Sequence, residues 1–141
     1  DRYRRQRQMC IRDRYEVAER ICEHEGSKKY GIISVITQAY YNTSLLFEVS
    51  NNLFTPPPKV NSAVISLKRK KNINLNCDEK LFLKIVKLSF QQRRKTLRNS
   101  LKQINLSDNL REDIIFDKRP EQLSVNEFID LTNLVSHDLN N

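Results

Sequence analysis

Glycine is nearly absent from this sequence of 141 residues, which contains only Gly26 and Gly31. A loop that cradles the phosphates of a nucleotide or dinucleotide needs several glycines in a short segment, because side chains would keep the backbone away from the ligand. The sequence therefore leaves almost no room for a self-contained nucleotide-cofactor site of either type.

Residues that commonly bind metals are few and widely spaced. The cysteines are Cys10, Cys22 and Cys77, and the histidines are His24 and His137. They form no paired metal-ligand motif, so we expect no metal site and interpret the cysteines as free thiols in a reducing compartment. A nucleophilic pair of one cysteine and one histidine is the alternative, but no local motif supports it.

No apolar run is long enough to span a bilayer. The longest one lies around residues 31–41, and the first residues are rich in arginine, unlike a signal peptide. With 38% hydrophobic residues, the chain can bury a modest core in one domain or two small ones. We predict a cytoplasmic, monomeric protein without a membrane segment.

Positive charge is unevenly distributed along the chain. The 25 Lys+Arg exceed the 17 Asp+Glu by a formal charge of +8. Residues 80–107 hold eight basic and no acidic side chains, whereas residues 108–141 hold three basic and eight acidic ones. A dense basic segment followed by an acidic one indicates a surface that meets a polyanion. A solvated face is the alternative, but eight uncompensated like charges repel one another, which favours a polyanionic partner.

The first 14 residues differ from the rest of the sequence. They hold six arginines against two aspartates and show no apolar periodicity. Residues 4–14, RRQRQMCIRDR, resemble the translation of an adapter used in transposon-based sequencing libraries. We therefore interpret residues 1–14 as a non-native leader, with authentic sequence beginning near Tyr15. A genuine basic arm that binds RNA or DNA is the alternative.

The first half of the remaining sequence predicts mixed helices and strands. Helical periodicity is present over residues 15–24, and residues 30–41 fit a buried helix better than a core strand because of their length. Strand composition at 45–49 and alternation over 62–68 predict two strands. Between them, Pro56 to Pro58 fix an extended strut.

Beyond about residue 72 the periodicity is helical. Asp78 is placed to cap a helix with an apolar face, and Ser124 with Glu127 has the spacing of a capping box for a last helix. A weaker helix is expected over 108–115. Another is expected over 93–104, where i,i+4 spacing predicts one cationic stripe. That stripe consists of Arg94, Arg98 and Lys102.

Several motifs together resemble one known family. LFTPPPKVNSAVISLKRK at 53–70 and SFQQRRKTLRNSLK at 89–102 are similar to segments of the ribosomal small-subunit (16S) RNA adenine dimethyltransferases, the KsgA/RsmA family. YEVAERI, GSKKYGIISV and RPEQLSVNEF occur in the order and spacing of that family, so the similarity extends over residues 15–135. It implies an α/β fold class: the C-terminal part of a Rossmann-like methyltransferase sheet over 15–71, then a small all-α RNA-binding domain over 72–141.

The resemblance implies an enzyme of ribosome biogenesis. Members transfer methyl groups from S-adenosylmethionine to the exocyclic amines of two adjacent adenines near the 3′ end of small-subunit rRNA. The family's cofactor loop, acidic ribose-binding residue and Asn-Leu-Pro-Tyr type motif precede the part that this chain matches. We therefore expect no catalytic or cofactor-binding residue here, and no methyl transfer by this chain alone. Alternatives are a non-catalytic helical RNA-binding module, a related drug-resistance rRNA methylase or a mitochondrial transcription factor.

The resemblance also suggests residues that contact RNA in the assembling small ribosomal subunit. Phe54, just before the prolines, is expected to stack on the flipped-out target adenine, with an ordinary core position as the alternative. Lys59 is expected to contact phosphate or to be simply solvated. The basic segment is expected to bind the rRNA backbone. Its candidate residues are Arg93, Arg94, Lys95, Arg98 and Lys102.

Overall fold

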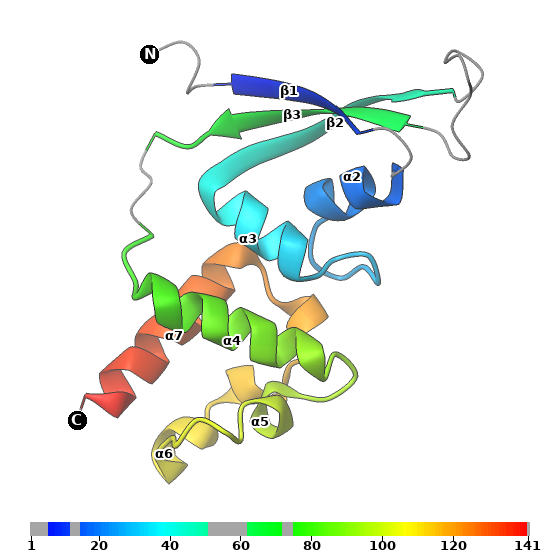
Figure 1. The fold of residues 1–141 in the computed structure, drawn as a ribbon. Coiled ribbons are helices and arrows are strands. Elements are labelled where there is room, and N and C mark those ends of the chain that lie inside the picture. Colours follow the sequence, from blue (N-terminus) through cyan, green and yellow to red (C-terminus); the bar gives the residue numbers. More distant parts are fainter. Residues whose placement is uncertain (1–5, 12–14, 51–61, 72–74, 141) are drawn as a thin grey trace.

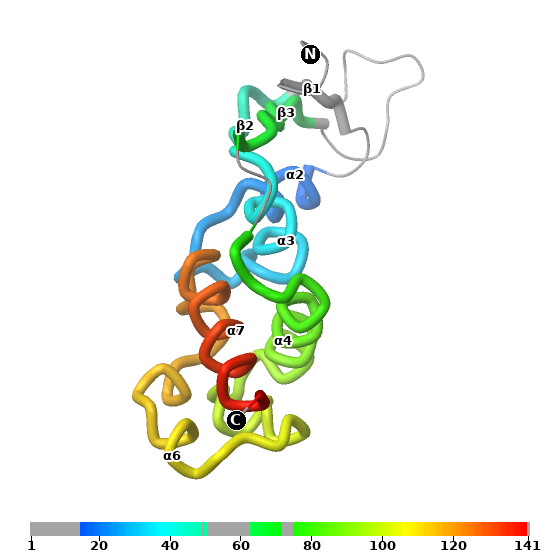
Figure 2. Tube along the Cα trace, turned by 90° about the vertical axis from the view of Figure 1, so that its left-hand side faces the viewer, coloured from blue at the N-terminus to red at the C-terminus, as the bar shows by residue number. Residues whose placement is uncertain are grey.

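A computed structural model describes residues 6–11, 15–50, 62–71 and 75–140 of the chain. A small sheet lies at one end, with α2 and α3 against one of its faces and the remaining helices beyond them (Figure 1). The side view shows the same succession along the molecule (Figure 2). In chain order the elements are β1 (Gln6–Ile11), α2 (Tyr15–Cys22), α3 (Ile32–Tyr40), β2 (Tyr41–Val49), β3 (Ser62–Arg69), α4 (Glu79–Gln91), α5 (Leu97–Ser100), α6 (Asp108–Arg111), the 3-10 helices η2 (Ile114–Asp117) and η3 (Pro120–Gln122), and α7 (Val125–Leu139).

The sheet has the strand order β1-β3-β2, and both outer strands run antiparallel to β3. The pairing of β2 with β3 shifts between Leu45 and Phe47, where the strand bulges. Ala63 and Ile65 of β3 are buried together with Ala18 and Ile21 of α2. The two strands predicted over 45–49 and 62–68 are therefore confirmed as parts of β2 and β3. The alternation in β3 arises because every second residue faces the covering helix.

Residues 6–11 form strand β1, whose backbone pairs with β3 from Gln6 opposite Lys68 to Ile11 opposite Ala63. An extended segment placed beside an open strand can satisfy backbone hydrogen bonds whatever its side chains are. The pairing therefore says nothing about where these residues come from. The interpretation of residues 1–14 as a leader stays a prediction.

Side chains of α3 hold the end of α2. The Ser34 hydroxyl donates to the Arg20 carbonyl, and Gln38 Nε2 donates to the carbonyls of Ile21 at 2.9 Å and Glu23 at 2.6 Å. The last carbonyls of a helix have no hydrogen-bond donor within the helix, so these side chains supply the missing donors at the end of α2. The buried helix expected over 30–41 is confirmed as α3, which ends where β2 begins at Tyr41.

The larger core lies between α3, α4 and α7. Both predicted caps are confirmed: the Asp78 carboxylate accepts from the amides of Lys80 and Leu81, and Ser124 forms a capping box with Glu127. This core joins residues from both sides of residue 72. Its largest fully buried members include Tyr30, Val35, Phe82, Ile85, Leu97, Leu101, Phe116, Leu123, Phe128 and Leu131.

The continuous helix expected over 93–104 is wrong. Helix α4 ends at Gln91, residues 92–95 form a turn, and only Leu97–Ser100 are helical. The Leu97 amide donates to the Lys118 carbonyl at 2.9 Å, so it is not available for the carbonyl of Arg93 that a continuous helix requires. The apolar periodicity of this segment arises because the turn after α5 also buries apolar side chains. Arg94, Arg98 and Lys102 consequently do not form a stripe along one helix.

The weaker helix expected over 108–115 is also interrupted. The chain forms α6 to Arg111 and then the separate 3-10 helix η2 from Ile114. Asp113 stands between them, and its carboxylate accepts from the amide of Ile115 at 3.0 Å. A side chain that caps a new turn competes with continuation of the previous helix.

Candidate nucleic-acid interface

The structure places five of the seven predicted RNA-binding residues. Phe54 and Lys59 lie outside the described residues, so their predicted roles stay predictions. The others follow the end of α4, in the turn at 92–95, in α5 and just after it. Their side chains differ in surroundings, and these surroundings separate residues that hold the fold from residues that are available to a ligand.

Arg93 turns back onto the protein. Its Nη2 donates to the carbonyls of Ser27 at 3.2 Å and of Tyr30, and its Nε lies 3.6 Å from Glu121 Oε2. The guanidinium also lies over the ring of Phe90, 5.7 Å from its centre. Only 30% of the side chain is exposed. Arg93 therefore joins the turn at 26–30, the end of α4 and η3.

Further contacts hold the turn at 26–30 that Arg93 binds. Gly26 has φ +96°, which favours glycine, and its amide donates to the Glu121 carbonyl at 2.7 Å. Tyr30 is fully buried, and its ring is steeply inclined, at 67°, to that of Phe90, with the centres 6.1 Å apart. Burial raises the pKa of the Tyr30 phenol, and the charges of Glu25 and Glu127 raise it further. The turn at 26–30 is thus anchored at both ends.

Arg98 is occupied too. Its Nη1 donates to Asp117 Oδ1, while Nε and Nη2 donate to the Arg111 carbonyl at 3.2 and 2.8 Å. It connects α5 with α6 and η2. The eight cations of residues 80–107 are therefore not all uncompensated, as the sequence suggested, because acids from the following segment pair with Arg93 and Arg98.

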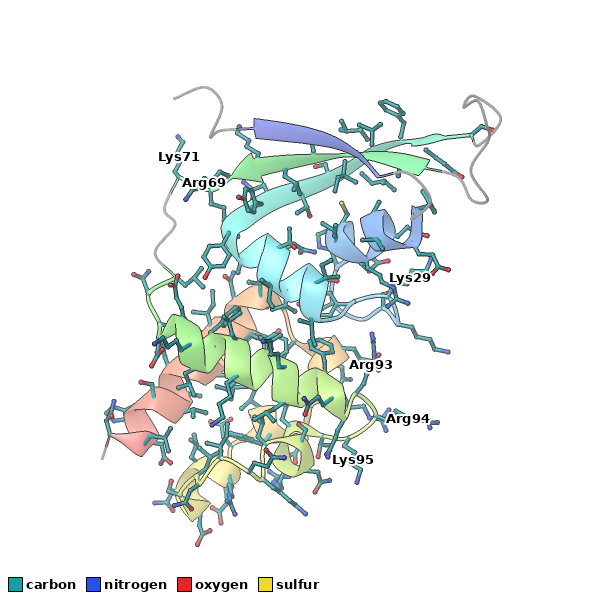
Figure 3. All side chains as sticks on the ribbon, viewed as in Figure 1. Lys29, Arg69, Lys71, Arg93, Arg94 and Lys95 are labelled. Atoms are coloured by element: carbon teal, nitrogen blue, oxygen red, sulfur yellow. The ribbon has the colours of Figure 1, made fainter. Side chains whose placement is uncertain are left out.

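The remaining cations near this turn are exposed. Arg94, Lys95 and Lys102 have neither an ion pair nor a side-chain hydrogen bond within the described part of the chain. Figure 3 shows Arg94 and Lys95 extending outward from the turn after α4, at the same edge as Lys29. Lys28 and Lys29 are both exposed, but Lys29 is paired with Glu19 at 2.6 Å, whereas Lys28 has no ion pair in the described part of the chain.

Lys28, Arg94 and Lys95 therefore form the candidate interface, held in place by Arg93. Sequence reasoning missed Lys28, although it is part of the motif GSKKYGIISV. No local signal separates it from any solvated lysine. Contacts distant in the chain bring it to this edge, among them the hydrogen bonds of Arg93 to Ser27 and Tyr30, 66 and 63 residues away. Clustered cations of this kind bind phosphate groups.

Comparison with known proteins identifies the family. The family model for ribosomal RNA adenine dimethylase matches residues 3–137. This chain belongs to that family. Ribosomal RNA small subunit methyltransferase A of Flavobacterium johnsoniae is 67% identical over 123 residues, which are 87% of this chain and 47% of that protein. The protein of the same name from Bacteroides thetaiotaomicron is 59% identical over 125 residues, covering 88% of this chain and 47% of that protein. This family member spans about half the length of these curated relatives.

Solved structures agree on the fold. A dimethyladenosine transferase from Plasmodium falciparum has a TM-score of 0.82 at 19% identity, covering 95% of this chain and 58% of that one. The 23S rRNA methyltransferase ErmE has a TM-score of 0.56 at 18% identity, covering 92% and 55%. This member of the adenine dimethylase family therefore has the α/β fold predicted from the sequence, the C-terminal part of a methyltransferase sheet followed by helices.

The family depends on S-adenosylmethionine, but the residues described for this chain supply no glycine-rich loop to hold it. Gly26 lies in a turn and Gly31 at the start of α3, five residues apart, so the two glycines do not make up such a loop. No group of three or more potential metal ligands occurs within the described ranges. None of the helices in those ranges is both long and apolar enough to cross a membrane.

Proposed function

We propose that this chain is the RNA-holding part of a 16S rRNA adenine dimethyltransferase. The whole enzyme transfers methyl groups from S-adenosylmethionine to the exocyclic amines of two adjacent adenines near the 3′ end of small-subunit rRNA. It acts in the cytoplasm, as a monomer, on an assembling small ribosomal subunit. The observation that carries the proposal is the 67% identity to a small-subunit methyltransferase A over 87% of this chain.

The described residues contribute binding rather than methyl-transfer chemistry. Lys28, Arg94 and Lys95 bind phosphates, since all three are exposed at the edge that Arg93 organises. Lys102 adds a further exposed cation after α5. The resemblance adds Phe54, which stacks on the target adenine, and Lys59, which contacts phosphate. The cofactor site belongs to the part of the longer relatives that this chain does not match.

The two main alternatives are less well supported. A related rRNA methylase with a role in drug resistance is expected to share the fold, as the 23S rRNA methyltransferase ErmE does, but the closely similar curated proteins are named small subunit methyltransferase A. A free-standing helical RNA-binding module would not be expected to match methyltransferases of about twice its length.

A chimaera tests the proposal. Residues from Tyr15 onward would be joined to the amino-terminal half of the Flavobacterium johnsoniae relative. We expect it to transfer labelled methyl groups to adenines of small-subunit rRNA, whereas the 141-residue chain alone transfers none. R94Q/K95Q in the chimaera should weaken rRNA binding and leave S-adenosylmethionine binding unchanged. A folded chimaera that binds both S-adenosylmethionine and rRNA but leaves the adenines unmethylated would overturn the proposal.

A further inference from the structure

A row of lysines runs along the outer face of α4. Lys80, Lys84 and Lys87 are all exposed, and so is Gln91 at the end of the helix. At 3.6 residues per turn these four positions fall within an arc of about 60°, and the three lysines extend over about 10 Å of the helix axis. We call Lys80, Lys84 and Lys87 the α4 lysine row.

The row faces away from the core. On the opposite side of α4, the helix buries Phe82, Ile85, Val86 and Ser89. The helix leads directly into the turn that carries Arg94 and Lys95 (Figures 1 and 3). The row therefore continues the candidate interface along the length of α4, on a helix that the core holds rigidly.

Nothing in the described part of the chain neutralises the row. None of its lysines belongs to an ion pair there. Asp78 accepts hydrogen bonds from backbone amides, and Glu79 accepts from the Tyr40 hydroxyl at 3.0 Å. Lysines at i,i+4 and i,i+3 repel each other, and Lys80 in the first turn opposes the helix dipole. The row therefore works against the stability of its own helix.

We propose that the α4 lysine row binds the phosphate backbone of rRNA, as an extension of the Lys28, Arg94 and Lys95 interface. This rests on the proposed function, which makes RNA the partner. A protein partner is expected to insert apolar anchors. The 60° arc of α4 that holds the lysine row and Gln91 offers no apolar side chain to meet them. A membrane-surface helix needs a free apolar face, whereas that of α4 is buried.

The test measures the affinity of the 141-residue chain for the 3′-terminal segment of Flavobacterium johnsoniae 16S rRNA at several salt concentrations. The variant K80Q/K84Q/K87Q should weaken binding at least tenfold at low salt. It should also reduce the slope of log affinity against log salt by about two to three, because each of the three phosphate contacts contributes roughly 0.7 to 0.9. Glutamine has nearly the helix propensity of lysine, so circular dichroism should remain that of the original chain.

Two controls isolate the row. K80R/K84R/K87R keeps the charges and should bind like the original chain. R20Q/R111Q/R119Q removes the same charge from α2, α6 and the segment between η2 and η3, none of it ion-paired in the described part of the chain, and should leave the salt slope unchanged. An equal loss in this second control would show a general charge effect and would overturn the inference.

The outcomes separate the inference from the proposed function. If R94Q/K95Q weakens binding while K80Q/K84Q/K87Q retains the original affinity and slope, the row does not bind RNA and the proposed function stands. If neither variant differs from the original chain, the whole RNA interface is wrong. If K80Q/K84Q/K87Q weakens binding to phosphatidylglycerol vesicles but not binding to RNA, the partner of the row is a membrane surface and the inference is likewise overturned.

Discussion

Replacing Arg93 by methionine should destabilise the fold rather than simply weaken RNA binding. Arg93 donates to the carbonyls of Ser27 and Tyr30 and pairs with Glu121. Hydrogen bonds to a charged group contribute about 1.5 to 3 kcal/mol each, less where solvent reaches them. We therefore expect Arg93→Met to lower the free energy of unfolding by about 2 to 4 kcal/mol, since two carbonyls lose their charged donor. Urea denaturation followed by circular dichroism measures this loss.

The neighbouring Arg94 provides the matched control. Arg94→Met removes the same side chain one residue later, from an exposed position. It should change the free energy of unfolding by less than about 0.5 kcal/mol and weaken rRNA binding instead. Arg93→Lys should be intermediate in stability, because an ammonium lacks the planar fork that reaches both carbonyls. If Arg93→Met unfolds at the same urea concentration as the original chain and loses as much rRNA affinity as Arg94→Met, Arg93 is an RNA ligand and the reasoning is refuted.

Three further predictions concern single polar groups. The buried Tyr30 hydroxyl has no hydrogen-bond partner in the described part of the chain, so Tyr30→Phe should leave the free energy of unfolding unchanged or raise it by about 1 kcal/mol; a clear loss in urea denaturation would reveal a partner. Hydrogen bonds from the Ser107 hydroxyl and amide lower the pKa of Asp138, so this pair stabilises the fold fully above the ordinary aspartate pKa of 3.8 and loses that effect as the pH falls through the lower folded-state pKa. Melting temperatures from pH 6 downward should therefore fall less steeply in Ser107→Ala, and identical pH profiles would contradict the pairing. Ser124→Ala removes the acceptor for the Glu127 amide at 3.2 Å and should cost about 1 kcal/mol, whereas Ser124→Asp should retain the cap; equal melting temperatures for all three chains would show that the cap is dispensable.

Local signals predicted those elements whose boundaries depend on nearby residues. Asp78 and Ser124 specify helix starts because a capping side chain bonds amides only two or three residues away. The alternation of Ala63 and Ile65 predicted β3 because successive side chains point to opposite faces of a strand. The motifs at 53–70 and 89–102 also indicated the family, which the match over residues 3–137 confirmed.

The candidate site followed from the sequence only in part. The basic segment predicted from composition includes the exposed Arg94 and Lys95 and also the lysines of α4. Composition did not show on which face of the helix those lysines lie. Lys28 was missed, and the intramolecular partners of Arg93 and Arg98 were not foreseen, while their predicted contacts with RNA stay predictions. Composition gives the number of charges, but it does not show which of them have a partner distant in the chain.

The sequence by itself therefore determined the family, the caps and the presence of a dense basic segment. Tertiary structure decided which of those charges face solvent. The Lys118 carbonyl accepts a hydrogen bond from the Leu97 amide, which prevents the continuous helix expected over 93–104. Glu121 and Asp117 form ion pairs with Arg93 and Arg98. Each of these contacts joins residues that are 19 to 28 positions apart, beyond the few residues over which helix spacing and capping act. The exposed cationic surface that we propose for RNA binding is consequently a property of the folded chain.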